Sequence, residues 1–293
     1  MNTKQNLIET KIVKSMLTLE EEMLSIKESI LEQLMIEGVD DPGILKCVFM
    51  AGGPGSGKSY TAKELFGVGK KTIASVSSGG LKLVNSDTAF EKGLKDNGID
   101  MKQLGNIEKN DPELWNIISG ENNKNSIRAQ AKKLTKQQQD FYEAGRLGMV
   151  IDGTGDKVSK IKEKVQHAKS LGYDCYMVFV NTSLEVALER NKTRERVLSD
   201  ELVTDIWKAC QHNLGAFQSM FGGNFTIVDN TEYKKYQSKF KNKQTGEIAF
   251  ADTIISQHIQ KAIDTFLRKP IQNQIGKKWI TTARLLKNKN IIK

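Results

Sequence analysis

The feature that most constrains this chain is a glycine-rich loop that matches the phosphate-binding pattern G-x-x-x-x-G-K-S in full. The loop reads Gly52-Gly53-Pro54-Gly55-Ser56-Gly57-Lys58-Ser59. An apolar run, Ile44 to Ala51, ends directly at its glycines, as expected of a buried parallel strand, and Ser59 to Phe66 predicts a helix. Glycines let the backbone curl around a phosphate group, and the helix N-terminus adds a partial positive charge. We therefore expect a P-loop α/β protein.

The loop also predicts roles for its side chains. We expect the residues from Gly52 through Tyr60 to bind the phosphates of a nucleoside triphosphate. Lys58 would reach the β and γ phosphates, and the hydroxyl of Ser59 would hold Mg²⁺.

Apolar runs alternate with helical patterns between residues 44 and 230. The predicted strands are Ile44 to Ala51, Leu81 to Ser86, Met149 to Asp152, Tyr176 to Val180 and Phe225 to Val228. The predicted helices are Ser59 to Phe66, Lys157 to Leu171, Leu184 to Arg190 and a mostly helical polar stretch before Gly148. Because such alternation is typical of parallel sheets, we predict an α/β fold of the small-kinase P-loop type. It would have a five-stranded parallel sheet, helices on both faces, and ligands at the carboxyl ends of the strands.

Two further segments flank this region, so the predicted domains are residues 1–43, 44–230 and 231–293. From Asn6 to Glu37, apolar residues recur at spacings of three and four, which predicts one long amphipathic helix. This helix packs on the protein's own core or binds a partner protein. Residues 231–293 hold 14 Lys and Arg against 4 Asp and Glu, which gives this segment a net charge of +10. The whole chain carries +9, so residues 1–230 carry a net charge of −1. The basic segment either binds nucleic acid or another polyanion, or is a solvated face.

Composition excludes several classes of protein. Hydrophobic residues make up 38% and charged residues 27%, and no apolar stretch approaches the length that a bilayer needs. We therefore expect a soluble, cytoplasmic protein without membrane contact. Cys47, Cys175 and Cys210 are far apart, which indicates reduced, buried thiols. Neither they nor the three histidines show metal-ligand spacing, so no zinc site is expected.

Polar side chains follow the second and third predicted strands. Asp87 comes after the second strand, beside the loop in this fold, where a carboxylate can accept the proton of an attacking hydroxyl. Asp152 ends the third strand, where a carboxylate can orient Mg²⁺ or its waters, and Thr154 can bond the acceptor. We expect Asp87, Asp152 and Thr154 to contact the substrate.

An arginine-rich run follows the fourth predicted strand and its helix. It contains Arg190, Arg194 and Arg196, and the first two would share a face if the helix continues to Arg194. The run is either a solvated helix end or a lid whose arginines neutralise charge on a moving phosphoryl group. We favour the lid, in which the three arginines join Lys58 as catalytic residues.

Together these motifs resemble zeta-toxin-type kinases over about residues 44 to 230. The resemblance rests on the loop and on Asn85-Ser86-Asp87, Asp152-Gly153-Thr154, the arginine run and Asp200-Glu201-Leu202-Val203. More narrowly, the chain looks like the zeta-like kinases of large bacterial viruses, which relate to polynucleotide kinases. The resemblance implies ATP as the nucleotide, Asp87 as the base, and the arginines as groups that stack on adenine and clamp phosphate. Zeta toxins usually carry Glu at the position of Asp152. They also have a Gly-rich lid that contains proline, where this chain has Glu195 to Leu202 without proline.

The predicted function is an ATP-dependent kinase that transfers the γ-phosphate to a hydroxyl group. Two kinds of acceptor stay open. The resemblance implies a nucleotide sugar or other small metabolite, whereas the basic segment favours a hydroxyl of nucleic acid, at a 5′ end or on a modified base. A different class is a nucleotide-dependent switch or binding protein that signals through the helix from Asn6 to Glu37.

Overall fold

The computed structural model of the chain describes residues 39, 43–67, 80–120, 122–194, 196–232, 236–241, 248–253 and 255–288. The predicted N-terminal helix from Asn6 to Glu37 lies outside the described residues, as do residues 68–79.

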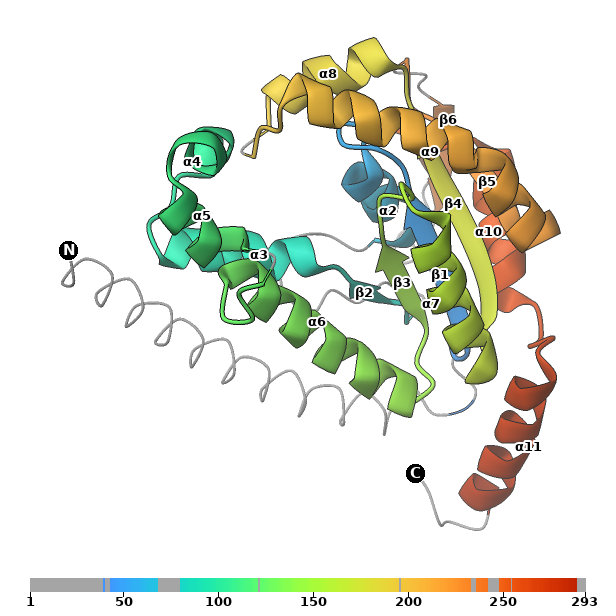
Figure 1. Cartoon of the computed structure of the whole chain (residues 1–293). Helices are drawn as coiled ribbons and strands as arrows, with labels where there is room; N and C mark the ends of the chain where they lie inside the picture. Colours follow the sequence, from blue (N-terminus) through green and yellow to red (C-terminus); the bar gives the residue numbers. More distant parts are fainter. Residues whose placement is uncertain are drawn as a thin grey trace.

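Five strands form one parallel sheet in the order β2-β3-β1-β4-β5 (Figure 1). They are β1 (Lys46–Ala51), β2 (Lys82–Val84), β3 (Met149–Asp152), β4 (Asp174–Asn181) and β5 (Phe225–Asp229). The predicted five-stranded parallel sheet is confirmed, with strand ends that differ from the predicted ones by up to two residues. β2 stops earlier than expected because Asn85 caps a helix, so Asp87 lies in a first helical turn.

The central position of β1 follows from its sequence. All six of its residues are buried, because both faces of the sheet are covered. Its side chains alternate: Cys47, Phe49 and Ala51 join the hydrophobic core on one face, whereas Val48 and Met50 join the core on the other. β1 therefore delivers the glycine loop at the centre of the carboxyl edge.

Helices cover both faces, as predicted. Phe217 of α9 (Asp200–Phe221) and Val165 of α7 (Val158–Ser170) pack in the core around Phe49. Leu65 of α2 (Lys58–Phe66) and Ile263 of α10 (Gln257–Arg268) pack in the core around Val48. A shorter helix, α8 (Leu184–Lys192), follows β4.

The long polar stretch after β2 is helical, as predicted, and forms a hydrophobic cluster of its own. It contains α3 (Ser86–Asp96), the 3-10 turn η2 (Met101–Gln103), α4 (Leu104–Asn110), α5 (Pro112–Ser119) and α6 (Ile127–Ala144). α6 begins at Ile127 because the Ser126 hydroxyl accepts a hydrogen bond from the amide of Ala129 and caps the helix. This cap brings Arg128 into the first turn of α6.

The basic segment after residue 230 packs on the sheet domain. A short turn, η3 (Gly222–Asn224), precedes β5, and an antiparallel pair, β6 (Tyr236–Lys241) and β7 (Ile248–Thr253), follows it. Ile263 and Phe266 of α10 lie in one core, and Ile271, before α11 (Gln274–Asn288), lies in the other. The division at residue 230 stays a prediction, although the two parts share their hydrophobic cores.

Two sequence expectations have direct structural outcomes. Cys47, Cys175 and Cys210 are all buried free thiols, as predicted. None of the helices in the described ranges is long and apolar enough to cross a bilayer.

Candidate active site

The glycine loop has a backbone that only glycine tolerates at three positions. Gly52, Gly55 and Gly57 have positive φ values of 146°, 76° and 87°. A Cβ atom on Gly55 would lie 2.3 Å from the carbonyl oxygen of Ala187, and one on Gly57 would lie 2.2 Å from the side-chain nitrogen of Asn230. The loop is therefore curled tightly against α8 and against the end of β5.

Neighbouring strand ends hold the loop from both sides. The amide of Gly52 donates to the carbonyl of Thr154, after β3, at 2.8 Å. The Asn230 side chain, after β5, donates to the carbonyl of Ser56 at 2.8 Å. The first contact uses the amide of Gly52 and the second a carbonyl of the loop, and the amide of Ser56 donates to the carbonyl of Gly53 at 3.2 Å. The amides at the start of α2 can still point at an anion.

Lys58 is folded back onto its own loop. Its Nζ donates to the carbonyls of Gly52 at 2.6 Å and Gly53 at 3.3 Å. Burial lowers the pKa of Lys58, and the Asp152 carboxylate is the strongest influence in the opposite direction. A negatively charged ligand on the loop would favour the charged form of Lys58.

The loop fits a polyphosphate by a second observation. The hydroxyl of Ser56 is buried and makes no hydrogen bond within the part of the chain that the structure describes. An unbonded buried hydroxyl is costly unless a ligand satisfies it. Ser59 and Tyr60, in the first turn of α2, are exposed, so the Ser59 hydroxyl is accessible to a cation.

Asp152 lies beside the loop, at the end of β3. It is opposite Met50 in the register with β1, and its Oδ2 accepts a hydrogen bond from Asn85 Nδ2 at 2.9 Å. Asn85 also caps α3, since its Oδ1 accepts from the amide of Asp87 at 2.8 Å. The Asn85 side chain therefore hydrogen-bonds both to Asp152 and to the backbone of Asp87, and so links the two segments that carry the predicted carboxylates.

Asp87 is held in a cluster with two arginines, which we call the Asp87 cluster: Asp87, Arg128 and Arg196. Asp87 Oδ1 lies 2.9 Å from Nη1 of Arg128 and 3.6 Å from Nη1 of Arg196. Both guanidinium groups also lie over the ring of Phe90, at 4.8 and 5.8 Å from its centroid. Burial lowers the pKa of Arg196, and Asp87 opposes this. The cluster joins α3, α6 and the segment after α8.

The three predicted arginines do not share one helix face. α8 ends at Lys192, so Arg194 lies beyond it and the condition under which Arg190 and Arg194 would share a helix face is not met. The helix ends there because the following segment folds back to Asn191. The Asn191 side chain donates to the carbonyl of Leu198 and accepts from its amide. Arg190 stays in the last turn of α8, whereas Arg196 reaches Asp87.

The predicted residues nevertheless converge on one site. Asp152, Arg194 and Asp87 are all close enough to Lys58 to influence its pKa. Thr154 is beside the loop through its carbonyl, while its hydroxyl bonds Asp156. Sequence reasoning missed Arg128, because it stands in a polar helix without a motif, and it did not see that Asn85 would join the two carboxylates.

Comparisons with known proteins agree with this architecture. A family model described as an AAA domain matches residues 47–216, which is more than half of the chain. No curated protein matches the sequence.

Solved structures show similarity at low identity. One comes from the PezAT chromosomal toxin-antitoxin system of Streptococcus pneumoniae, with 11% identity, a TM-score of 0.47, and coverage of 92% of this chain and 96% of that chain. The complex AvrRxo1-ORF1:AvrRxo1-ORF2 with sulphate ions has 13% identity, a TM-score of 0.41, and coverage of 90% and 73%. The same complex with ATP has 14% identity, a TM-score of 0.39, and coverage of 90% and 74%.

The family match includes the glycine loop, Asp87, Asp152 and the arginine run, and it agrees with the P-loop relationship that the motifs predict. The chain belongs to the AAA domain family.

Proposed function

We propose that the protein is an ATP-dependent kinase that transfers the γ-phosphate to a hydroxyl group of an anionic small metabolite, such as a nucleotide sugar. The observation that carries this proposal is the Asp87 cluster beside the glycine loop. A protein that hydrolyses a nucleotide can also use an arginine beside the loop, but a carboxylate paired with two arginines suits the binding of an anionic acceptor and the removal of its hydroxyl proton.

The loop and its neighbours would bind the nucleotide. Main-chain amides between Gly52 and Ser59 would hold the phosphates, and Lys58 would leave its two carbonyl partners for them. Ser59 and Asp152 would hold Mg²⁺, which neutralises charge on the phosphates when it is bound. Arg190 and Arg194 would clamp the nucleotide from the α8 side.

The Asp87 cluster would bind and activate the acceptor. Two guanidinium groups on one carboxylate leave a net positive charge, which an anionic acceptor would complement. When Arg128 or Arg196 binds phosphate oxygens of the acceptor instead of Asp87, the Asp87 carboxylate loses an ion pair. It can then accept the proton of the acceptor's hydroxyl group. Thr154 would position the acceptor from the other side of the loop.

A second candidate is a kinase for a hydroxyl of nucleic acid, which the balance of +10 in residues 231–293 favours. The fold supports it less. The carbonyl of Lys269 accepts a hydrogen bond from Lys46, the first residue of β1, so the chain after α10 lies at the amino end of the sheet. That end is opposite the glycine loop.

One experiment separates these functions. Purified protein is incubated with γ-labelled ATP, Mg²⁺ and separate pools of nucleotide sugars, nucleosides and hydroxyl-ended oligonucleotides, beside the variants Lys58→Ala and, as a matched control on α2, Lys63→Ala. We expect label in a nucleotide sugar with wild type and Lys63→Ala, and none with Lys58→Ala. Label only in the oligonucleotides would favour the second candidate. ATP hydrolysis with no labelled acceptor would favour a switch that acts through residues 6–37.

A further inference from the structure

Asn191 is a fully buried polar side chain in the last turn of α8, with 0% of its surface exposed. It follows Ala187 by four residues, so the two side chains lie on the same face of the helix. α8 packs closely on the glycine loop there, because the carbonyl of Ala187 occupies the space beside Gly55. A buried amide side chain lowers stability unless its polar atoms are hydrogen-bonded. The hydrogen bonds of Asn191 therefore show what this position holds in place.

Both ends of the Asn191 amide bind the backbone of one residue. Its Nδ2 donates to the carbonyl of Leu198 at 2.8 Å, and its Oδ1 accepts from the amide of Leu198 at 3.2 Å. The main-chain carbonyl of Asn191 also accepts from the amide of Arg194 at 3.2 Å. The hydroxyl of the next residue after Leu198, Ser199, caps α9 by accepting from the amide of Leu202. The connection between α8 and α9 is therefore fixed at both of its ends.

Arg196 extends from this connection to the Asp87 cluster. Its Nη1 lies 3.6 Å from Asp87 Oδ1, and its guanidinium group lies 5.8 Å from the centroid of the Phe90 ring. The side chain is 18% exposed, and its Nε is buried without a hydrogen bond to any of the described residues. A buried donor of a charged group is costly when no acceptor satisfies it. Arg196 can therefore donate this N–H to an oxygen of an anion that binds at the Asp87 cluster.

Arg194, from the same connection, lies near the lysine of the glycine loop. Its side chain is half-buried. Burial is the main cause that lowers the pKa of Lys58, and the positive charge of Arg194 lowers it further. Two cations this close repel each other until an anion binds between them. Since the lysine of this motif reaches the β and γ phosphates, Arg194 is placed for the terminal phosphate of a bound nucleotide.

We infer that Asn191 is a positioning residue that divides two arginines between the two substrates: Arg194 to the terminal phosphate of the nucleotide, and Arg196 to the anionic acceptor. The inference rests on the proposed kinase function. The two arginines are two residues apart, so a small change in the path of the backbone would displace both side chains. Phosphoryl transfer is sensitive to such displacements, because it depends on how groups are positioned around the phosphate. The two hydrogen bonds from Asn191 to Leu198 fix that path.

The test measures the nucleotide affinity of the full chain with Mg²⁺, using fluorescent mant-ATP and mant-ADP. Asn191→Ala and Arg194→Ala should each weaken ATP binding about tenfold, the effect of losing one hydrogen bond to a charged group. ADP has no γ-phosphate, so its affinity should stay close to that of wild type. Arg196→Ala should leave both affinities unchanged. Thr193→Val is the matched control, because it removes an exposed hydroxyl of the same connection, which bonds the carbonyl of Arg190, and it should bind both nucleotides normally.

A double-mutant cycle separates positioning from a general loss of stability. Asn191→Ala combined with Arg194→Ala should bind ATP no more weakly than Arg194→Ala alone, because the arginine that Asn191 positions is already absent. Three results would overturn the inference: wild-type ATP affinity in Asn191→Ala, a loss in the double variant equal to the product of the single losses, or equal losses in Arg194→Ala and Arg196→Ala. Should Asn191→Ala not fold, Asn191→Asp is measured in its place, since it keeps the size of the side chain and removes only the donor.

These affinities do not depend on phosphoryl transfer. A wild-type protein that binds ATP but labels no acceptor would contradict the proposed kinase function, and the cycle would still decide whether Asn191 positions Arg194. A wild-type protein that binds no ATP would overturn both. With a labelled acceptor, Arg196→Ala should raise the KM for that acceptor and leave the KM for ATP unchanged. The opposite pattern would contradict the division of the two arginines.

Discussion

At the scale of single residues, the candidate site depends on how Asp87 is held. Its carboxylate faces Arg128 and Arg196, and its main-chain amide bonds the side chain of Asn85. The arginines stabilise the charged form, so a base in this position is effective only once an acceptor has drawn an arginine away. The cluster would couple acceptor binding to proton removal.

Asp87→Asn should therefore keep ATP binding and lose phosphoryl transfer. Asparagine has nearly the same shape but cannot accept the proton, and general-base catalysis contributes about 10²- to 10⁴-fold. The dissociation constant of ATP, measured by calorimetry, should change little, whereas the turnover number should fall by that factor. Turnover close to wild type would remove Asp87 from the role of base.

A second prediction concerns Asn85, which uses both ends of its amide. Asn85→Ala removes the cap of α3 and should lower the free energy of unfolding by about 1 kcal/mol. Asn85→Asp keeps an oxygen for the cap but replaces the donor to Asp152 with a second carboxylate, and the repulsion between the two carboxylates should also lower the free energy of unfolding. Both variants should lose activity. Full activity of Asn85→Asp would show that the contact with Asp152 has no positioning role.

At the scale of elements, the site is built where a strand, a loop and a helix meet at the carboxyl edge of the sheet. β1 ends at Ala51, the loop curls against α8 and Asn230, and α2 begins at Lys58. The curl depends on glycines, because main-chain atoms of neighbouring elements occupy the space of any side chain.

Gly55→Ala should therefore abolish nucleotide binding. The added Cβ would lie 2.3 Å from the carbonyl of Ala187, and φ is positive, so the loop must move. Gly215→Ala in α9 is the matched control, since nothing lies within 4 Å of its Cβ position. It should bind nucleotide normally and gain about 0.5–1 kcal/mol of stability. The affinity of both variants is measured by the binding of fluorescent ATP. Wild-type affinity in Gly55→Ala would contradict the assigned backbone conformation of the loop.

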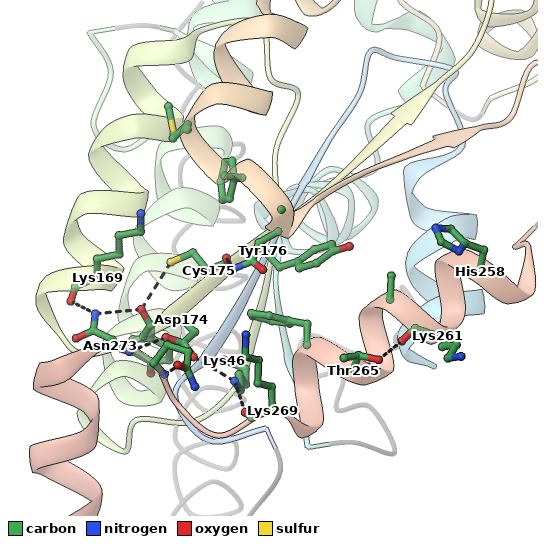
Figure 2. A pocket seen from close by; sticks show the side chains of 18 residues that line it. Lys46, Lys169, Asp174, Cys175, Tyr176, His258, Lys261, Thr265, Lys269 and Asn273 are labelled. Carbon is green, nitrogen blue, oxygen red and sulfur yellow. Dashed lines mark hydrogen bonds and ion pairs between the residues drawn. The ribbon is translucent and has the colours of Figure 1, made fainter.

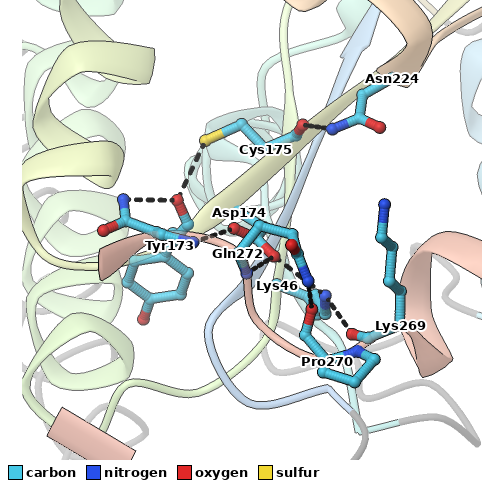
Figure 3. Close-up of polar contacts among 9 residues, drawn as sticks. Lys46, Tyr173, Asp174, Cys175, Asn224, Lys269, Pro270 and Gln272 are labelled. Carbon is cyan, nitrogen blue, oxygen red and sulfur yellow. Dashed lines mark hydrogen bonds and ion pairs between the residues drawn. The ribbon is translucent and has the colours of Figure 1, made fainter. Parts of the chain in front are cut away.

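At the scale of the whole molecule, the C-terminal segment is attached to the sheet through Asp174. This carboxylate accepts from Lys46 and from two amides just before α11 (Figure 3), and the backbones at Gly172 and Gly276 come so close that a Cβ on Gly276 would lie 2.2 Å from the carbonyl of Gly172. The segment therefore completes the amino end of the sheet and lines a cavity of about 610 Å³ there, together with β1, β4 and α10 (Figure 2).

Asp174→Ala should loosen that attachment. It leaves the ammonium group of Lys46 buried without its carboxylate, and breaking a buried pair costs about 3–5 kcal/mol. Denaturant unfolding should show the loss, and hydrogen exchange should speed up in residues 271–288. Asp264→Ala, which removes an acceptor from Gln260 on α10, is the control and should change stability by less than about 0.5 kcal/mol. Unchanged exchange in residues 271–288 would contradict the attachment.

The sequence by itself determined the sheet and the glycine loop, because both depend on local patterns: apolar runs that end in glycines, and a helix that follows Lys58. It also predicted that Asp152 ends one strand and that Asp87 follows the neighbouring one, although Asp87 lies in the first turn of α3. Only the tertiary structure decided what surrounds them. Arg128 is distant in sequence from Asp87 and Arg196, α8 stops where Asn191 binds Leu198, and the cavity needs β1, β4 and α10 together. Contacts of this kind join side chains far apart in the chain, and no local period or motif records them.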